Sequence, residues 1–149
     1  SGTLPETLNN IAYFEREDAS QITTISLDME VRGGTEENMD LFGINGQAMD
    51  LSQINFTVNK GEIEIWQVTG QRMPHPFHIH GVSFQILTLN GEPVSEADRG
   101  WKDTVVVWDE VTEIIVRFDH EATEEFPLMV HCHMLEHEEY GMMWQFTVE

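Results

Sequence analysis

Residues 62–68, EIEIWQV, carry the pattern that predicts the fold of this chain. Ile63 and Ile65, with Val68 fitting less regularly, alternate with polar residues, which predicts a strand with one face toward the core and one toward solvent. From Gln21 onward, similar short segments rich in Val, Ile, Phe and Thr alternate with Gly, Asn, Asp and Pro turns, without a long helical pattern. The sequence therefore predicts an all-β sandwich.

Eight strands are expected within this pattern. They fall at Ile22–Met29, Gln53–Val58, Glu62–Val68, Ser83–Leu89, Thr104–Trp108, Glu113–Phe118, Pro127–Cys132 and Met142–Val148. Asn-Gly pairs at 45–46 and 90–91 predict tight turns. Residues 1–20 are polar and irregular, which predicts a linker or an appended N-terminal segment that packs along a surface, ahead of a domain over residues 21–149.

Composition narrows the classes of partner. A chain of 149 residues with 40% hydrophobic content suits one compact domain. Seven Lys and Arg against 27 Asp and Glu give a formal charge of −20, which argues against nucleic acid and anionic membranes as partners. Cys132 is the single cysteine, so an intrachain disulfide cannot form, and stability must come from the core and from any bound metal.

The histidines are unevenly distributed along the chain. Six of the seven lie in HPFHIHG at 75–81 and HCHMLEHEEYGMM at 131–143, and His120 lies elsewhere. Scattered histidines would be interpreted as surface or core residues. Here they cluster around the single cysteine and are followed by Met142, so imidazole and soft sulfur donors occur together, which predicts metal binding.

Strand geometry separates these donors into two sets, because successive side chains of an extended chain point to opposite faces. In 131–133 the two imidazoles share one face and the thiol takes the other. If 75–80 is extended, the same rule separates His75 from the other two histidines. The first set can recruit His75, Cys132, His137 and, as a weak ligand, Met142, and the second can recruit His78, His80, His131 and His133. The first set is that of a blue copper electron-transfer site, and Cys132 can conduct electrons to the second.

Three segments together resemble a known family. HPFHIHG, GWKDTV at 100–105 and HCHMLEHEEYGMM resemble the C-terminal domain of multicopper oxidases, especially bacterial copper-efflux oxidases, laccases and bilirubin oxidases. The resemblance runs from about Leu41 to the end, and FGINGQAMD at 42–50 resembles the segment that opens this domain. It implies a cupredoxin fold, which is a Greek-key β-sandwich.

The resemblance also implies a role for each ligand. It makes His75, Cys132 and His137 the type 1 copper ligands with Met142 as the weak axial ligand, His78 a type 2 ligand, and His80, His131 and His133 type 3 ligands. The remaining histidines of the trinuclear copper cluster would come as two HxH pairs from an N-terminal cupredoxin domain of the same polypeptide or of another subunit.

The implied activity is that of an oxidase. A reducing substrate would give electrons one at a time to the type 1 copper, Cys132 would pass them on, and the completed cluster would reduce oxygen to water, so that the isolated domain would be inactive. Glu138 resembles a carboxylate that delivers protons in this reaction, with a solvated glutamate as the alternative. Asp103 would orient a type 1 histidine or cap a turn. The substrate stays open between a phenol, an aromatic amine, a bilin and a low-valent metal ion, and the family location is extracytoplasmic.

Two rival functions belong to other classes. A separate blue-copper electron carrier and a nitrite-reductase-like domain would both use the first ligand set. Neither has a use for the two HxH pairs of the second set, so the oxidase hypothesis is preferred.

Overall fold

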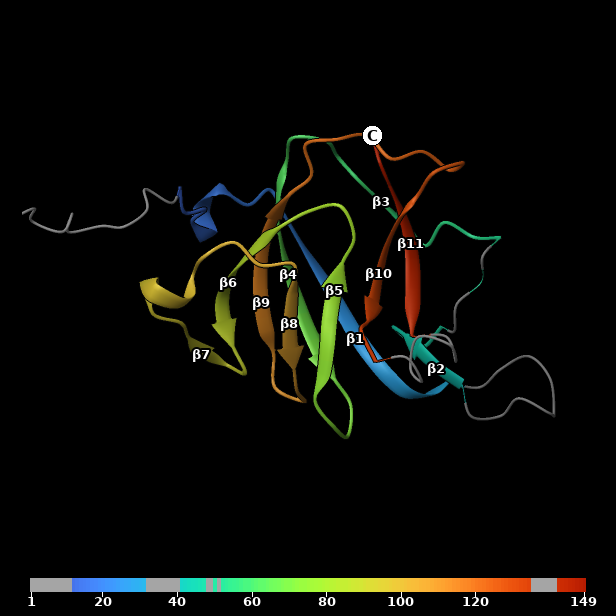
Figure 1. The fold of residues 1–149 in the computed structure, drawn as a ribbon, viewed down its shortest axis with the longest axis horizontal. Helices are drawn as coiled ribbons and strands as arrows, with labels where there is room; N and C mark the ends of the chain where they lie inside the picture. Colours follow the sequence, from blue (N-terminus) through green and yellow to red (C-terminus); the bar gives the residue numbers. More distant parts are fainter. Residues whose placement is uncertain (1–11, 32–40, 48–49, 51, 135–141) are drawn as a thin grey trace, which may run out of the picture.

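The structure of the protein is a computed structural model that describes residues 12–31, 41–47, 50, 52–134 and 142–149. Within these residues the chain forms two β-sheets and two short 3-10 helices (Figure 1). The elements are η1 (Arg16–Asp18), β1 (Gln21–Val31), β2 (Leu41–Ile44), β3 (Phe56–Val58), β4 (Ile63–Gly70), β5 (His75–Ile79), β6 (Phe84–Leu89), β7 (Glu92–Pro93), η2 (Glu96–Asp98), β8 (Thr104–Val107), β9 (Thr112–Arg117), β10 (Leu128–Cys132) and β11 (Met143–Val148).

The two sheets pack face to face around one core. One sheet has the strand order β2-β1-β4-β9-β6-β7 and the other the order β3-β11-β10-β5-β8. Strand β1 runs parallel to β4 and β3 parallel to β11, while the other neighbours are antiparallel. The ring of Trp66 on β4 lies 6.4 Å from that of Phe77 on β5 and 6.0 Å from that of Phe146 on β11, so aromatic contacts join the sheets. The prediction of an all-β sandwich is confirmed.

All eight predicted strands are present, with ends displaced by a few residues. Strands β2, β5 and β7 were not among them. Strands β2 and β7 are short and lie at sheet edges, whereas β5 lies inside its sheet, in the histidine segment that was considered only as conditionally extended. The two Asn-Gly turns are confirmed. Asn45 and Gly46 have φ of 49° and 78°, and Asn90 and Gly91 have 50° and 83°, which is the left-handed backbone that these residues adopt in tight hairpin turns.

The predicted orientation of β4 is wrong. Trp66 and Val68 belong to the core between the sheets, whereas Ile63 and Ile65 lie on the opposite face. That face is not simply solvated, because Ile65 is 1% exposed. The indole is the largest apolar side chain of the strand and takes the inter-sheet position. Alternation of small aliphatic residues did not reveal this, because both faces of β4 are largely buried.

The segment before β1 packs on the outer face of the larger sheet. The amide of the buried Gln85 donates to the carbonyl of Ala12 (3.0 Å) and accepts from the backbone N–H of Phe14 (2.8 Å). The guanidinium of Arg16 donates two hydrogen bonds to the carboxylate of Glu113, at 2.5 and 3.1 Å. These contacts cover part of the sheet face on which Ile65 lies. The boundary between a linker and a domain at residues 20 and 21 stays a prediction.

Candidate metal centre

Two adjacent strands of the smaller sheet carry the histidine segments. Strands β5 and β10 pair antiparallel, so that His131 lies opposite His78 and Cys132 opposite Phe77. Along β5 the side chains of His75, Phe77 and Ile79 are buried, and the residues between them are partly exposed. Burial along β5 therefore follows the expected alternation, whereas on β10 both His131 and Cys132 are buried.

The inward face brings a thiol and an imidazole together. His75 and Cys132 are both 0% exposed, and Nδ1 of His75 lies 3.6 Å from Sγ of Cys132. A first-row ion bound tetrahedrally, about 2.0 Å from nitrogen and 2.3 Å from sulfur, separates these donors by about 3.5 Å. The pair thus has the spacing of two ligands of one metal ion. We call it the inward pair.

A backbone contact sets the protonation of His75. Its Nε2–H donates to the carbonyl oxygen of Gln71 at 2.8 Å, and a carbonyl can only accept. Nδ1 therefore carries the lone pair that faces Cys132. Burial lowers the pKa of His75 below its ordinary value, although the hydrogen bond to Gln71 works in the opposite direction. The lowered pKa favours the neutral imidazole, and the hydrogen bond to Gln71 leaves Nδ1 available to a metal, which is the usual arrangement for a metal-ligating histidine.

Of the other two predicted ligands of this set, Met142 lies within the described residues and His137 does not. Met142 is 0% exposed and belongs to the core, and its carbonyl accepts a hydrogen bond from the N–H of Cys132 at 3.2 Å. His137 and Glu138 lie outside the described residues. Gly70, which no sequence signal singled out, closes the other side of the pair. A Cβ added there would lie 2.5 Å from Cδ2 of His75.

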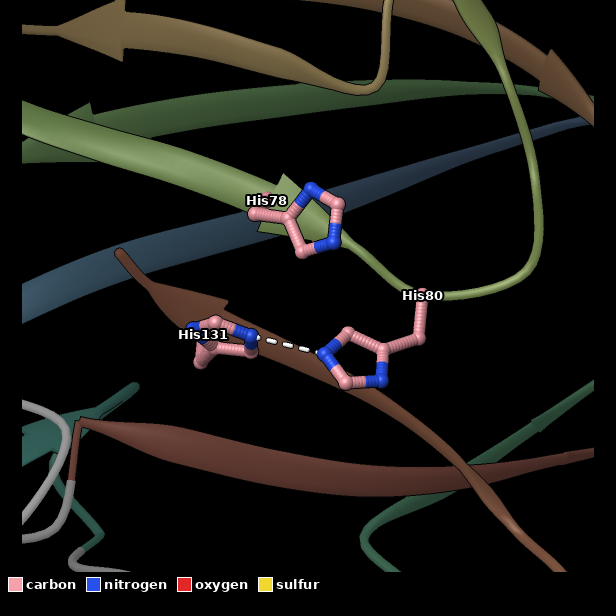
Figure 2. Close-up of side chains that lie close together, drawn as sticks. All are labelled: His78, His80 and His131. Atoms are coloured by element: carbon pink, nitrogen blue, oxygen red, sulfur yellow. Dashed lines mark hydrogen bonds between the residues drawn. The ribbon is translucent and has the colours of Figure 1, made fainter.

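The outward face gathers the other histidines (Figure 2). One ligand atom from each of His78, His80 and His131 lies within 4.8 Å of the other two. We call these three residues the outward cluster. Nε2 of His80 is 2.8 Å from Nε2 of His131, and Nδ1 of His131 donates to the carbonyl of Cys132 at 3.1 Å. His133 borders the cluster, with its ring centroid 5.5 Å from those of His78 and His131.

An open cavity of about 540 Å³ adjoins the outward cluster, lined in part by His78, His80 and Asp103. Asp103 was expected to orient a type 1 histidine or to cap a turn, and among the described residues it contacts His78 of the second ligand set. The carbonyl of Asp103 accepts from Nδ1 of His78 at 2.8 Å, and its carboxylate accepts from the hydroxyl of Thr104 at 3.0 Å. Strand β8 pairs with β5 so that His78 lies opposite Thr104, which places this aspartate next to the second ligand set.

The donors suit two kinds of metal chemistry. A buried thiolate with imidazole is a soft set that favours copper or zinc, whereas the outward cluster offers imidazole nitrogen alone. A neutral nitrogen pair only 2.8 Å apart needs a proton or a metal ion between the two lone pairs. Both sets therefore fit copper, and the cavity leaves the outward cluster open on one side.

Comparison with known proteins agrees with these donor sets. The multicopper oxidase family model matches residues 17–149. The multicopper oxidase mco of Staphylococcus aureus is 36% identical over 133 residues, which are 85% of this chain and 28% of that protein. The cell division protein FtsP of Salmonella typhimurium is 41% identical over 106 residues, which are 71% of this chain and 22% of that protein.

A solved structure of a bacterial laccase-like multicopper oxidase, CueO from Ochrobactrum sp., superposes with a TM-score of 0.84 at 36% identity. The match covers 99% of this chain and 34% of that one. This chain belongs to the multicopper oxidase family, and its fold is cupredoxin-like. It spans about a third or less of the length of these relatives. None of the helices in the described residues is long and apolar enough to cross a membrane.

Proposed function

We propose that this chain is the domain of a multicopper oxidase that holds a type 1 copper at the inward pair and supplies half the ligands of a trinuclear cluster from the outward face. The observation that carries the proposal is the alternation on β5 and β10. It puts the thiol and His75 on the buried side and His78, His80 and His131 on the other. His137 and Met142 would complete the first site, and His133 would complete the second.

Copper bound at these ligands would supply one-electron redox chemistry and, in a completed cluster, the reduction of oxygen to water. The protein's part is to hold and connect the two sites. Cys132 would be the strong thiolate donor, and the peptide bonds to His131 and His133 make it the shortest covalent route between them. The carbonyls of Gln71 and Asp103 would hold each imidazole in one tautomer and one orientation.

The partner we propose is an N-terminal cupredoxin domain with two HxH pairs, on the same polypeptide or on another subunit. The open cavity beside His78 and His80 supports this, because donors from a second domain have room to approach there. Glu138 would deliver protons to the completed cluster. We also propose an extracytoplasmic location, and a small reducing substrate together with oxygen as the reactants.

A blue-copper carrier remains the rival. It would explain the buried His75 and Cys132 but not three further imidazoles with ligand atoms within 4.8 Å of one another. The relatives carry different names, a multicopper oxidase in one case and a cell division protein in another. The ligand residues therefore carry the proposal, and the overall match supports only the family.

Oxygen uptake tests the division of the active centre. The chain alone, loaded with copper, is expected to be blue but to consume negligible oxygen with a phenolic donor. Addition or fusion of an N-terminal domain with two HxH pairs should restore uptake, and the same domain with those histidines changed to alanine is the control. Oxidase-like turnover by the lone monomeric chain would contradict the proposal, as would a folded, copper-loaded chain without blue colour.

A further inference from the structure

We propose that Thr104 is a positioning residue for His78, and that with the carboxylate of Asp103 it holds Nε2 of this imidazole ready for a metal ion. The inference rests on the proposed function, because it assigns a purpose to one contact of the outward cluster. Neither the sequence pattern nor the family match assigns a role to Thr104.

Two oxygen atoms converge on one nitrogen of the His78 ring. Nδ1 lies 2.8 Å from the carbonyl oxygen of Asp103 and 3.0 Å from Oγ1 of Thr104. The hydroxyl of Thr104 also lies 3.0 Å from the Asp103 carboxylate. The three residues thus form a connected set in which the only proton donors are the ring nitrogen and the hydroxyl.

The direction of each hydrogen bond follows from this set. The Asp103 carbonyl cannot donate, so Nδ1 must carry the proton. An ionised carboxylate can only accept, so the Thr104 hydroxyl points its proton toward Asp103 and turns a lone pair toward His78. Nε2 is consequently the unprotonated nitrogen. Figure 2 shows one ring nitrogen of His78 on the side of His80 and the other turned away.

The side chain of Thr104, not the backbone, is the adjustable part of this contact. The Asp103 carbonyl also accepts the N–H of Ile79 at 3.3 Å, so the pairing of β5 with β8 determines where it lies. Any residue at 103 would supply that carbonyl. Only a hydroxyl at 104 adds a second acceptor, which resists the ring flip that would place a carbon at this position. His78 is 19% exposed and Asp103 is 65% exposed, so the set lies where the cluster meets solvent.

The first test measures which nitrogen of His78 carries the proton in the metal-free chain. In nitrogen NMR of the Thr104→Val variant, the fraction of His78 in the Nε2–H form should rise by about five-fold, the effect of losing one ordinary hydrogen bond. Thr104→Ser keeps the hydroxyl and should match the original chain. An unchanged tautomer ratio in Thr104→Val would overturn the inference without affecting the proposed function.

The second test uses cupric ion and separates the two sites by spectroscopy. Electron paramagnetic resonance follows the binding of non-blue copper. Thr104→Val should bind this copper about ten-fold more weakly than the original chain, because a metal-ligating histidine that loses its hydrogen-bond partner typically loses about that much affinity. The blue absorption should not change. Asp103→Ala should show a smaller loss, because both the carbonyl of residue 103 and the Thr104 hydroxyl remain as acceptors for Nδ1. Glu124→Ala, at an exposed position, is the charge control.

The outcomes separate the two proposals. Equal weakening in Thr104→Val and Thr104→Ser would mean that the threonine methyl group packs the site, and would overturn the positioning role. If the original chain bound no non-blue copper, the outward metal site of the proposed function would fail, while the NMR result would still decide whether Thr104 positions His78.

Discussion

The inward pair and the outward cluster come from the same two strands, yet they are opposite in environment. His75 and Cys132 are fully buried within the sandwich core, whereas the outward cluster borders an open cavity. A buried thiol with one imidazole can hold an ion away from water, and an open set of imidazoles can share an ion with a second protein surface. The comparison teaches that one-residue alternation is enough to give two sets of donor side chains different surroundings.

The two sets also differ in which nitrogen of the histidine ring carries the proton. His75 donates from Nε2 and presents Nδ1, while His78 and His131 donate from Nδ1 and present Nε2. In each case a backbone carbonyl selects the tautomer. The nitrogen nearer the backbone thus serves the core side and the more distant nitrogen serves the open side, which gives the outward rings a longer reach.

The largest expected effect separates the two sites completely. Cys132→Ser should abolish the blue absorption, because the thiolate is the strong donor, and should leave non-blue copper binding by the outward histidines within about two-fold, because the change lies on the opposite face. Copper titration followed by visible absorption and electron paramagnetic resonance measures both. Loss of both signals in a folded variant would contradict the independence of the two faces.

A change at Gly70 should damage only the inward pair. The added methyl of Gly70→Ala would lie 2.5 Å from Cδ2 of His75 and 3.2 Å from the carbonyl of Val107, so the ring must move. Overpacking of this kind costs about 1–3 kcal/mol, and if that cost falls on the metal-bound geometry, blue copper should bind about 5- to 150-fold more weakly. Gly100→Ala, where a methyl would meet nothing within 4 Å, is the matched control. If the two variants bind copper alike, the close approach is not a constraint on His75.

A smaller effect is expected from Met142→Leu. The swap nearly conserves volume in the core and should cost less than about 1.5 kcal/mol of unfolding free energy. Because the thioether is only a weak axial ligand, the colour should remain and the reduction potential should rise. Redox titration of the blue absorption measures the shift. Loss of copper as complete as in Cys132→Ser would contradict the axial role.

The smallest effect should come from a site remote from both metals. The hydrogen bond from Arg16 is the main cause that holds the pKa of Glu113 below its ordinary value, so its stabilisation is present above the unfolded-state pKa and is lost as pH falls through the folded-state pKa. Glu113→Gln should cost about 1 kcal/mol at pH 7, since Arg16 is half exposed.

Urea unfolding at several pH values measures this cost, and the difference from the original chain should shrink in acid. Both copper signals should stay unchanged. Glu121→Gln, which removes an exposed ion pair with Lys60, is the matched control and should have a smaller effect. A difference that grows as pH falls would contradict the assigned direction of the Glu113 shift.

The sequence predicted eight of the strands, and it predicted which donors of one extended segment share a face, because both depend on local side-chain alternation. Parity separated His75 from His78 and His80 without any knowledge of how the strands pair. Long-range pairing could not be predicted in this way. The contact of Asp103 with His78 depends on the register of β8 against β5, and Gly70 matters only because its backbone passes the His75 ring. The predicted orientation of β4 was wrong because both faces of this strand are largely buried, which removes the alternation of apolar and polar residues.

The place of β10 in the middle of its sheet has a consequence for protein engineering. Strand β10 lies between β5 and β11, with one side in the core and the other beside the outward histidines. A designer who transplants the tripeptide 131–133 into another sandwich must therefore choose an interior strand with one dry side and one wet side. In a strand packed between two layers, both faces are dry, and the same three residues could furnish only one of the two environments. The tripeptide can be transferred only into a sheet that has one dry face and one wet face.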